Sequence, residues 1–396
     1  MAGDGRRTTL GEAAELLTGF PFKSAAFSDD PSNIRLLRGD NIVQGRTRWD
    51  GAKRWPSDAV SEYRDYQLRS GDVVLAMDRP WIEAGLKHAT LTEADCPSLL
   101  VQRVARLRAR PGVDQRFLGY VIRSTDFTNY VLAAQTGTAV PHISGGQIKA
   151  YEFTLPSTKQ QMAAAELLGS LDDKIELNRR MAETLEAMAR ALFRSWFVDF
   201  DPVRAKAEGW PTHLPDDVAA LFPDRLGGNG LPDEWANNAD AIAELSRSIV
   251  SPKEVDPATP YIGLDHLPRR SLIVAQRGKA EEVDSAKTAF ASGDLLFGKL
   301  RPYFHKVSIA PFDGICSSDI FVFKPRAGVP ASFLYFSFSQ DRFVRSASNA
   351  SSGTRMPRAD WNYMRQQPQE LPPTDLLNKF DKLASPLIAK MLASTQ

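Results

Sequence analysis

Basic and aromatic side chains gather in two loops of the sequence that resemble each other. Residues 70–80 read SGDVVLAMDRP and residues 292–302 read SGDLLFGKLRP, so an Arg-Pro pair follows a strand-like run in each copy. An arginine in such a turn projects from the surface and can donate to a phosphate or to a base edge. A tight turn that the arginine merely caps explains the pattern nearly as well. The chemistry in question is therefore nucleic-acid contact.

The candidate contacts lie in or beside these loops and carry a side chain that can donate or stack. They are Arg79, Trp81, Thr138 and His142 in the first copy, and Lys299, Arg301, Tyr303, Thr354, Arg355 and Arg358 in the second. Backbone N–H groups in the loops TGTAVPH and SSGTRMPR can hold a phosphate, although a plain turn is as good an explanation. Arg103, Arg106, Arg108 and Arg110 alternate along one run, which is more typical of solvated surface than of groove contact.

The loops belong to an internal repeat. Residues 110–156 align without a gap with residues 326–372, and 12 positions are identical, where roughly three would arise from average residue usage. The net charge of the chain is only +1, but residues 299–372 hold ten Lys/Arg against five Asp/Glu, and residues 79–156 hold nine against six. Corresponding parts of both copies are thus basic. Within each copy, short strand-like runs and helical segments alternate, which predicts mixed α/β units.

Catalytic and cofactor motifs are absent from the sequence. It contains no phosphate-binding G-x-x-x-x-G-K-[ST] loop, no G-x-G-x-x-G after a strand, no N-P-P-[YF] tetrad and no G-x-S-x-G. Two cysteines and five scattered histidines give no metal-binding spacing. No run approaches the ~20 apolar residues of a membrane span. We expect a cytoplasmic, non-enzymatic protein without a cofactor, a structural metal or a membrane contact.

A long helix separates the two copies. From Thr158 to about Val198, helix-forming residues dominate, and apolar or small residues recur at spacings of 3 and 4, which indicates a coiled coil ~60 Å long. The corresponding second helix, residues 373–396, carries Leu377, Phe380, Ala384, Leu387 and Met391, and Pro386 should kink it. Because the second helix is shorter, we expect an unmatched cluster that binds a protein partner. This cluster is Met188, Leu192, Phe193, Trp196 and Phe197, unless the following segment covers it.

These features resemble the specificity (S) subunit of type I restriction-modification systems. The resemblance is carried by LGEAAELLTGFPFKSAAF, LRGDNI, the repeated SGD…RP, and above all the run LLGSLDDKIELNRRMAETLEAMARALFRSWFVDFDPVRAKAEGW. It implies an α+β fold with two similar mixed α/β target-recognition domains, separated by long helices that form an antiparallel coiled coil. The implied parts are target-recognition domain 1 at 1–156, spacer helix 1 at 157–199, a linker at 200–234, target-recognition domain 2 at 235–372 and a short spacer helix 2 at 373–396.

The resemblance also implies partners. Each recognition domain would read one half of a split site in double-stranded DNA. The helices would dock methyltransferase (M) subunits, two of them in the family's pattern, and restriction (R) subunits would join indirectly. S-adenosylmethionine is expected only on the M subunit. The family's second helix usually continues beyond the point where this one stops, at Gln396. That departure motivates an alternative, a coiled-coil scaffold or decoy that binds M subunits without reading DNA.

Overall fold

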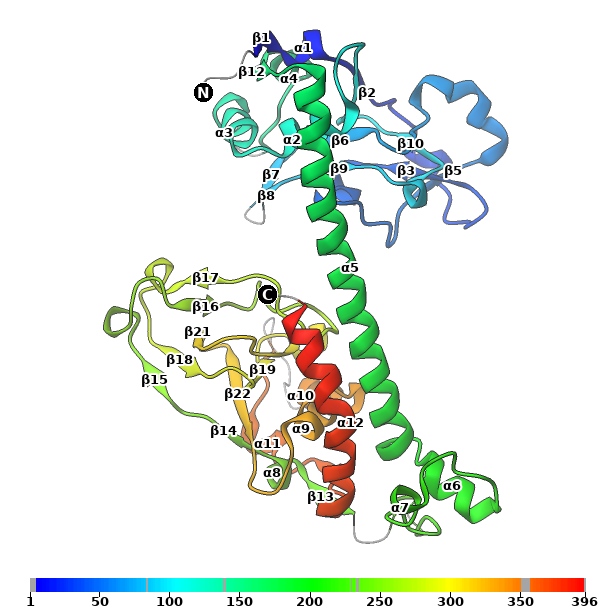
Figure 1. Cartoon of the computed structure of the whole chain (residues 1–396), viewed down its shortest axis with the longest axis vertical. Helices are drawn as coiled ribbons and strands as arrows, with labels where there is room; N and C mark the ends of the chain where they lie inside the picture. The colour runs from blue at the N-terminus through cyan, green and yellow to red at the C-terminus, as the bar shows by residue number, and fades with distance from the viewer. Residues whose placement is uncertain are drawn as a thin grey trace. The chain divides into compact units, whose positions relative to one another are not determined.

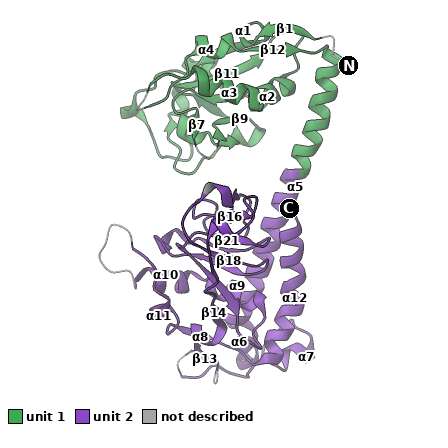
Figure 2. Ribbon diagram, turned by 90° about the vertical axis from the view of Figure 1, so that its left-hand side faces the viewer, with its two compact units in different colours: residues 1–174 green, residues 175–396 purple. Residues whose placement is uncertain are grey.

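The computed structural model describes residues 5–82, 85–137, 140–228, 230–232, 235–349 and 357–394. The chain divides into two compact units, Met1–Lys174 (unit 1) and Ile175–Gln396 (unit 2), which Figure 2 colours separately. The boundary falls inside the 40-residue helix α5 (Thr158–Phe197), so the long helix expected here is confirmed. The domain limits expected at 156, 235 and 372 stay predictions.

Unit 1 is built on a five-stranded sheet of order β2-β11-β6-β9-β4. Its central strand β6, VVLA, is buried at all four positions, because neighbouring layers cover both of its faces. The helix α2 starts where the Asp114 side chain accepts a hydrogen bond from Phe117 N at 2.9 Å, and α3 starts at Ser124 in the same way. The bounds of the sheet strands are β2 (Ala14–Thr18), β11 (Val104–Ala109), β6 (Val73–Ala76), β9 (His88–Thr90) and β4 (Gln44–Gly45).

The remaining elements of unit 1 are short. A three-stranded sheet has the order β10-β3-β5, and two strand pairs are β1-β12 and β7-β8. Their bounds are β10 (Ser98–Leu100), β3 (Ile34–Leu37), β5 (Arg54–Trp55), β1 (Arg6–Thr9), β12 (Glu152–Leu155), β7 (Trp81–Ile82) and β8 (Gly85–Leu86). The helices are α1 (Leu10–Ala13), α2 (Gln115–Arg123), α3 (Thr125–Ala134) and α4 (Gly145–Ala150), with 3₁₀ turns η1 (Ser24–Ala26), η2 (Gly39–Asn41), η3 (Ser57–Tyr66) and η4 (Glu93–Asp95).

Unit 2 contains a four-stranded sheet of order β14-β22-β19-β20 and a five-stranded sheet of order β15-β18-β21-β16-β17, with β13 paired to β23. The strands are β13 (Ala236–Asn238), β14 (Ala243–Leu245), β15 (Ile249–Val250), β16 (Pro260–Ile262), β17 (Gly278–Lys279), β18 (Lys287–Phe290), β19 (Leu295–Gly298), β20 (Val307–Ile309), β21 (Gly314–Cys316), β22 (Ile320–Pro325) and β23 (Pro368–Glu370). The helices are α6 (Asp201–Glu208), α7 (Asp216–Ala219), α8 (Ala239–Ile242), α9 (Ala331–Phe338), α10 (Asp341–Asn349), α11 (Trp361–Met364) and α12 (Thr374–Ala393), with 3₁₀ turns η5 (Pro252–Glu254), η6 (Ala280–Glu282) and η7 (Pro302–Phe304).

The two units share one topology, as the internal repeat predicts. The order β2-β11-β6-β9 in unit 1 matches β14-β22-β19-β20 in unit 2. The registers also agree, because Leu107 pairs with Val73 in unit 1 and Phe323 pairs with Leu295 at the corresponding positions of unit 2. In both units the first strand pairs antiparallel with a strand near the end of the repeat, β1 with β12 and β13 with β23. The prediction of two similar mixed α/β units is confirmed.

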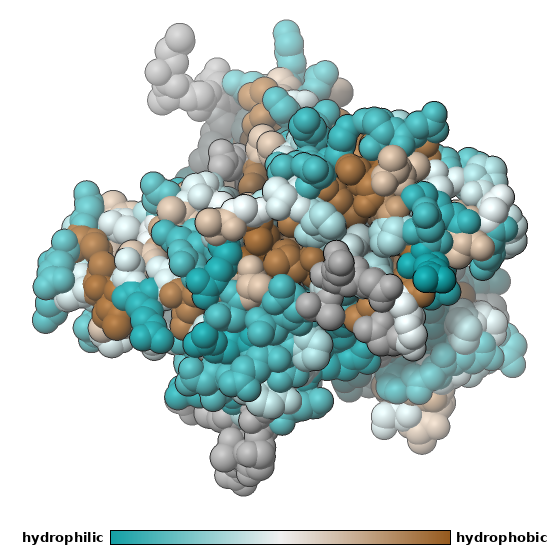
Figure 3. Space-filling view, turned by 90° about the horizontal axis from the view of Figure 1, so that it is seen from below, coloured by the Kyte–Doolittle hydropathy of each residue, from teal (hydrophilic) through white to brown (hydrophobic). Residues whose placement is uncertain are grey.

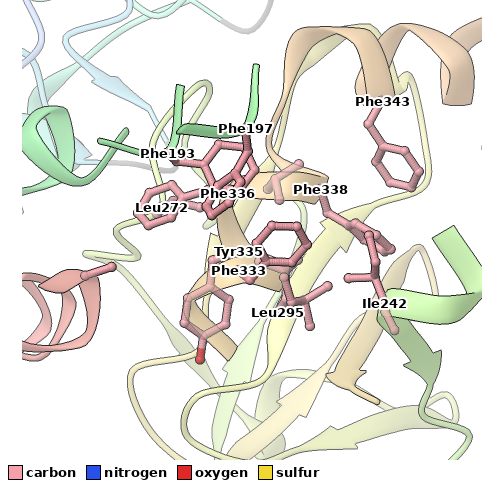
Figure 4. Packing of buried hydrophobic residues seen from close by; sticks show 14 of the residues in the cluster. Phe193, Phe197, Ile242, Leu272, Leu295, Phe333, Tyr335, Phe336, Phe338 and Phe343 are labelled. Atoms are coloured by element: carbon pink, nitrogen blue, oxygen red, sulfur yellow. The ribbon is translucent and has the colours of Figure 1, made fainter. Parts of the chain in front are cut away.

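Within unit 2, the end of α5 and the helix α12 lie side by side and antiparallel (Figures 1 and 2). Phe380 of α12 lies 5.2 Å from Phe197 and 5.8 Å from Phe193, measured between ring centroids. The expected seam of α12 is confirmed, since its residues pack into this core, and the helix continues through Pro386. Figure 4 shows the α5 rings reaching the phenylalanines of α9.

Among the described residues, no helix is long and apolar enough to cross a bilayer. On the face shown in Figure 3, hydrophilic residues prevail and hydrophobic residues form scattered patches.

Candidate nucleic-acid interface

The SGD segments are turns that lead into the central strands β6 and β19. Gly71 and Gly293 have φ values of 87° and 89°, a conformation that residues with a side chain rarely adopt. The next residue closes the turn, because Asp72 accepts a hydrogen bond from Arg69 N and Asp294 accepts one from Ala291 N, both at 2.8 Å. The glycine and the aspartate of this motif are therefore structural, as the turn alternative proposes.

The Arg-Pro segments follow the same strands and are held by main-chain hydrogen bonds. Arg79 N donates to Pro141 O at 2.6 Å, and Arg301 N donates to Pro357 O at 2.8 Å. Both arginines are left-handed, with φ values of 43° and 50°. Because this conformation is uncommon for a residue with a side chain, its recurrence at matching positions shows that the surrounding bonds impose it.

Two further hydrogen bonds complete this arrangement in each unit. In unit 1, Met77 N donates to Arg103 O at 2.9 Å, and Met77 O accepts from Ile143 N at 2.9 Å. In unit 2, the equivalent bonds are Lys299 N to Asp319 O at 2.7 Å and Ala359 N to Lys299 O at 2.8 Å. These bonds join three main-chain segments in each unit, which we call the turn scaffold. The segments are 77–79, 103 and 141–143 in unit 1, and 299–301, 319 and 357–359 in unit 2.

The turn scaffold of unit 1 brings Arg79, Trp81 and His142 together. Arg79 is exposed, and Trp81 is exposed at the start of β7. The Asp78 carboxylate contacts Arg103 Nη1 and His142 Nδ1, each at 2.6 Å. Partial burial raises the pKa of Asp78, but the hydrogen bonds from Arg103 and His142 outweigh it and hold the pKa below its ordinary value. Asp78 is thus an anion that orients two neighbouring donors.

The turn scaffold of unit 2 likewise brings Lys299, Arg301, Tyr303 and Arg358 together. Arg358 is exposed and pairs with Asp319 at 3.1 Å, while Tyr303 is exposed on η7. Lys299 is engaged internally, because its Nζ donates to Ser318 O at 2.7 Å and lies 4.4 Å from the centroid of the Phe321 ring. Burial lowers the pKa of Lys299. Of these four side chains, Lys299 is the least available to a ligand.

Arg301 differs from Lys299 in having an unused donor. Its side chain is half-buried, and its Nε is buried without a hydrogen-bond partner among the described residues.

The candidates Thr138, Thr354 and Arg355 lie outside the described residues.

Two lysines beside the scaffolds were not among the candidates. Lys87 O accepts from Ala76 N at 3.0 Å, and Lys306 O accepts from Gly298 N at 2.8 Å, so the two lysines occupy equivalent positions. Burial lowers the pKa of both, and Arg79 and Arg48 lower that of Lys87 further. No motif marks these lysines. The only signal in the sequence was that Lys87 and Lys306 align when the repeat is extended beyond the Arg-Pro pairs.

In the arginine run 103–110, Arg103 and Arg110 are exposed, as the alternation suggests, but Arg106 and Arg108 are not. Arg106 is buried and donates to Glu15 at 2.8 Å, and Arg108 makes two hydrogen bonds to the Asp72 carboxylate at 2.6 and 2.9 Å. Both arginines belong to β11, whose neighbours β2 and β6 supply the acidic partners or the loops that carry them. The expectation is wrong at these two positions, because alternation does not distinguish a solvated face from one that covers charges.

The proposed partner-binding cluster is also corrected. Phe193, Trp196 and Phe197 are 3%, 1% and 1% exposed, and they pack on rings of α9, α12 and the segment after α5. The expectation that they lack a partner within the chain is wrong, since α12 and the following segment cover them. Met188 remains exposed and Leu192 is partly buried. A role for these two residues in binding a partner stays a prediction.

The chain is similar to known specificity subunits. Residues 9–187 match the family described as "Type I restriction modification DNA specificity domain". Over 168 residues, 42% of this chain and 28% of the relative, it is 34% identical to the Type I restriction enzyme EcoAI specificity subunit of Escherichia coli. Over 178 residues, 45% of this chain and 41% of the relative, it is 32% identical to the MjaVIII specificity subunit of Methanocaldococcus jannaschii. The matches thus span less than half the length of these relatives.

A solved structure shows a similar fold. The crystal structure of the type I restriction-modification S subunit from M. genitalium superposes with a TM-score of 0.55, covering 100% of this chain and 93% of that one, at 12% identity. This likeness supports the mixed α/β fold with a long helix.

Proposed function

We propose that the chain, which is similar to the specificity subunits of type I restriction-modification systems, reads a split target in double-stranded DNA and docks methyltransferase subunits. The observation that carries this proposal is the duplicated turn scaffold, which presents an arginine from a left-handed turn in each unit. Two related surfaces with different side chains suit a target made of two unlike half-sites.

The side chains around the scaffolds suit DNA. Arg79 in unit 1 and Arg358 in unit 2 are exposed cations that can donate to phosphates or, in pairs of hydrogen bonds, to guanine. Arg301 lies in the same turn of unit 2, and its side chain is half-buried. Asp78 and Asp319 are each paired with a cation of their own unit, so they do not leave an unpaired negative charge facing the ligand. The local basic excess supplies the general attraction to phosphate.

The partner subunits are part of the proposal. We propose that α5 and the adjoining surface, including Met188, dock M subunits, two in the complete complex, and that restriction subunits bind through them. Methyl transfer and cleavage then take place on those partners, with S-adenosylmethionine on M. The chain itself contributes recognition without catalysis.

A binding selection tests this proposal. The full chain is co-purified with the M subunit of its own system and incubated with a pool of random-sequence duplexes, and bound duplexes are sequenced. We expect one motif in two halves with an unread gap of constant length. Enrichment of no motif by a complex that does form contradicts the proposal and favours the scaffold or decoy alternative.

Variants of the scaffold arginines sharpen the test. Arg79→Ala and Arg358→Ala should each weaken binding to the selected duplex by about 1–3 kcal/mol if they read bases. If they contact phosphates, each should instead reduce the salt slope by about 0.9. Arg7→Ala is the matched control, because Arg7 is an exposed arginine paired with Glu152 on the β1–β12 ribbon, away from the turn scaffold. Its binding should match that of the wild type.

A further inference from the structure

Each turn scaffold places one exposed aromatic ring at the same position. Trp81 follows Arg79-Pro80 and Tyr303 follows Arg301-Pro302. Their side chains are 38% and 54% exposed. Among the described residues, only four aromatic side chains are this exposed, the other two being Trp210 and Tyr363. Two of the four therefore occupy equivalent sites in two copies of one turn.

Local secondary structure does not explain this agreement. Trp81 begins the strand β7, which pairs with β8, whereas Tyr303 lies in the 3₁₀ turn η7. The proline before each ring is buried, which anchors the main chain while the ring stays outside. Since the backbone differs after the turn, the shared feature is the outward aromatic group itself.

The surroundings of the rings are cationic. In unit 1, the exposed Arg79 lies two residues before the ring, and Lys87 lies near both Arg79 and Arg48. The carboxylates near Lys87, Asp40 and Asp78, are each paired with another arginine. In unit 2, Tyr303 packs edge-to-face on Phe304 at 4.8 Å, and the Arg269 guanidinium lies 4.0 Å from the centroid of the Phe304 ring. An apolar protein partner would have to desolvate these cations, whereas a polyanion with flat apolar groups fits both features.

We propose that Trp81 and Tyr303 are paired base contacts, each lying against base edges in the half-site that its own unit reads. The proposal deepens the function proposed above and rests on it. The partner is duplex DNA, whose phosphates complement the flanking cations and whose thymine methyl groups and base edges complement the rings. The turn scaffold fixes where each ring enters, and the ring contributes sequence preference and little to general affinity.

The test uses the full chain in complex with its M subunit, as wild type and as Trp81→Ala, Tyr303→Ala, Trp81→Phe and Tyr303→Phe. Each complex selects from the same random-sequence duplex pool. We expect Trp81→Ala to lose sequence preference in one half of the motif only, and Tyr303→Ala in the other half only. Affinity for the wild-type motif should fall by about tenfold in each case, while the phenylalanine variants keep most of it.

Two controls separate base contact from other roles. Affinity for a random-sequence duplex and the salt slope should stay within about twofold of the wild type, because a ring neutralises no phosphate. Tyr363→Ala, which removes an equally exposed ring from α11 of unit 2, should leave both halves of the motif intact. If an alanine variant lowers the melting temperature, Trp81→Gln and Tyr303→Gln repeat the test with a longer, polar side chain.

The outcomes are distinguishable. If the alanine and glutamine variants select the wild-type motif with wild-type affinity, the inference is wrong and the proposed function stands. A uniform loss on specific and random duplexes alike also overturns it, since that pattern indicates general electrostatics or misfolding. If the wild-type complex itself enriches no motif, the proposed function fails and this inference fails with it.

Discussion

Units 1 and 2 build the same turn scaffold and fill it with different charges. At three equivalent positions, unit 1 has Asp78, Arg103 and His142, and unit 2 has Leu300, Asp319 and Arg358. The carboxylate comes from the Arg-Pro turn in unit 1 and from the turn before β22 in unit 2, yet in both cases it pairs with the side chain at position 142 or 358. The comparison teaches that the main chain carries the common geometry and that side chains carry the difference.

The cores of the units differ in another way. The main core of unit 2 includes Phe193, Trp196 and Phe197 of α5, packed against Phe333 and Phe380. The core of unit 1 is assembled from its own strands and from α2, α3 and α4. Unit 2 therefore depends on the long helix for its aromatic core, and unit 1 does not.

Removing one α5 ring should produce the largest difference in stability between the two units. Trp196→Ala deletes a buried ring from the core of unit 2 and should lower its free energy of unfolding by about 3–5 kcal/mol. Hydrogen exchange of the full chain, read peptide by peptide, should show faster exchange throughout unit 2 and unchanged protection of the unit 1 sheet. Equal loss in both units would contradict the separate cores.

A histidine gives unit 1 a pH dependence that its counterpart in unit 2 lacks. His88 on β9 faces Leu75 across the sheet, and the equivalent of His88 is Val307, paired with Phe297. Burial, and to a lesser extent the charge of Arg123, lower the pKa of His88 from 6.5 to about 4. Between pH 6.5 and pH 4, the unfolded chain therefore binds a proton at His88 and the folded unit does not. Stability that is present above pH 6.5 is lost as the pH falls toward 4, by about 1.4 kcal/mol per pH unit.

Replacing this residue by its counterpart, His88→Val, should flatten the pH dependence of unit 1 between pH 6.5 and pH 4. Urea unfolding at several pH values, followed by exchange in unit 1 peptides, measures the slope. Unit 2 must be read separately, because burial also lowers the pKa of His305. An unchanged slope in unit 1 would show that His88 is protonated in the folded state.

The turn-closing aspartates should sharpen the comparison by a smaller effect. Asp72 holds Arg108, whereas burial raises the pKa of Asp294. Asp72→Asn leaves Arg108 half-buried without its anion and should destabilise unit 1 by about 1–3 kcal/mol at pH 7. Asp294→Asn keeps an acceptor for Ala291 N and removes a buried charge, so it should change the stability of unit 2 by less than about 0.5 kcal/mol. Equal losses in urea unfolding would mean that the Arg108 pair contributes nothing.

Much of the architecture was predictable because it depends on periodicity and repetition. The 3–4 spacing in α5 and α12, and the matched segments SGD…RP, indicate the long helix and the duplicated units. That the segments of Arg79 and His142 belong to one site was also foreseeable, since both segments recur at the offsets of the repeat. Periodicity does not indicate which charged side chains are buried in the folded chain. The partners of Arg106 and Arg108 are Glu15 and Asp72, which are far away in the sequence.

The aromatic cluster of α5 was misjudged for a related reason. The shorter second helix suggested rings without a partner, but Phe222 and Trp235, which pack on Trp196 and Phe197, come from a segment rich in proline and glycine. Such a segment has no periodic signal, so its contribution to the core is visible only in the folded chain.

The turn scaffold is closed by peptide groups alone, from Arg79 N to Pro141 O and from Arg301 N to Pro357 O. Side chains are free to vary as long as the peptide groups meet. Residues 77–79 and 299–301 therefore form a shared main-chain frame, and the two units can differ in the side chains that the frame presents without a change in the bonds that close it.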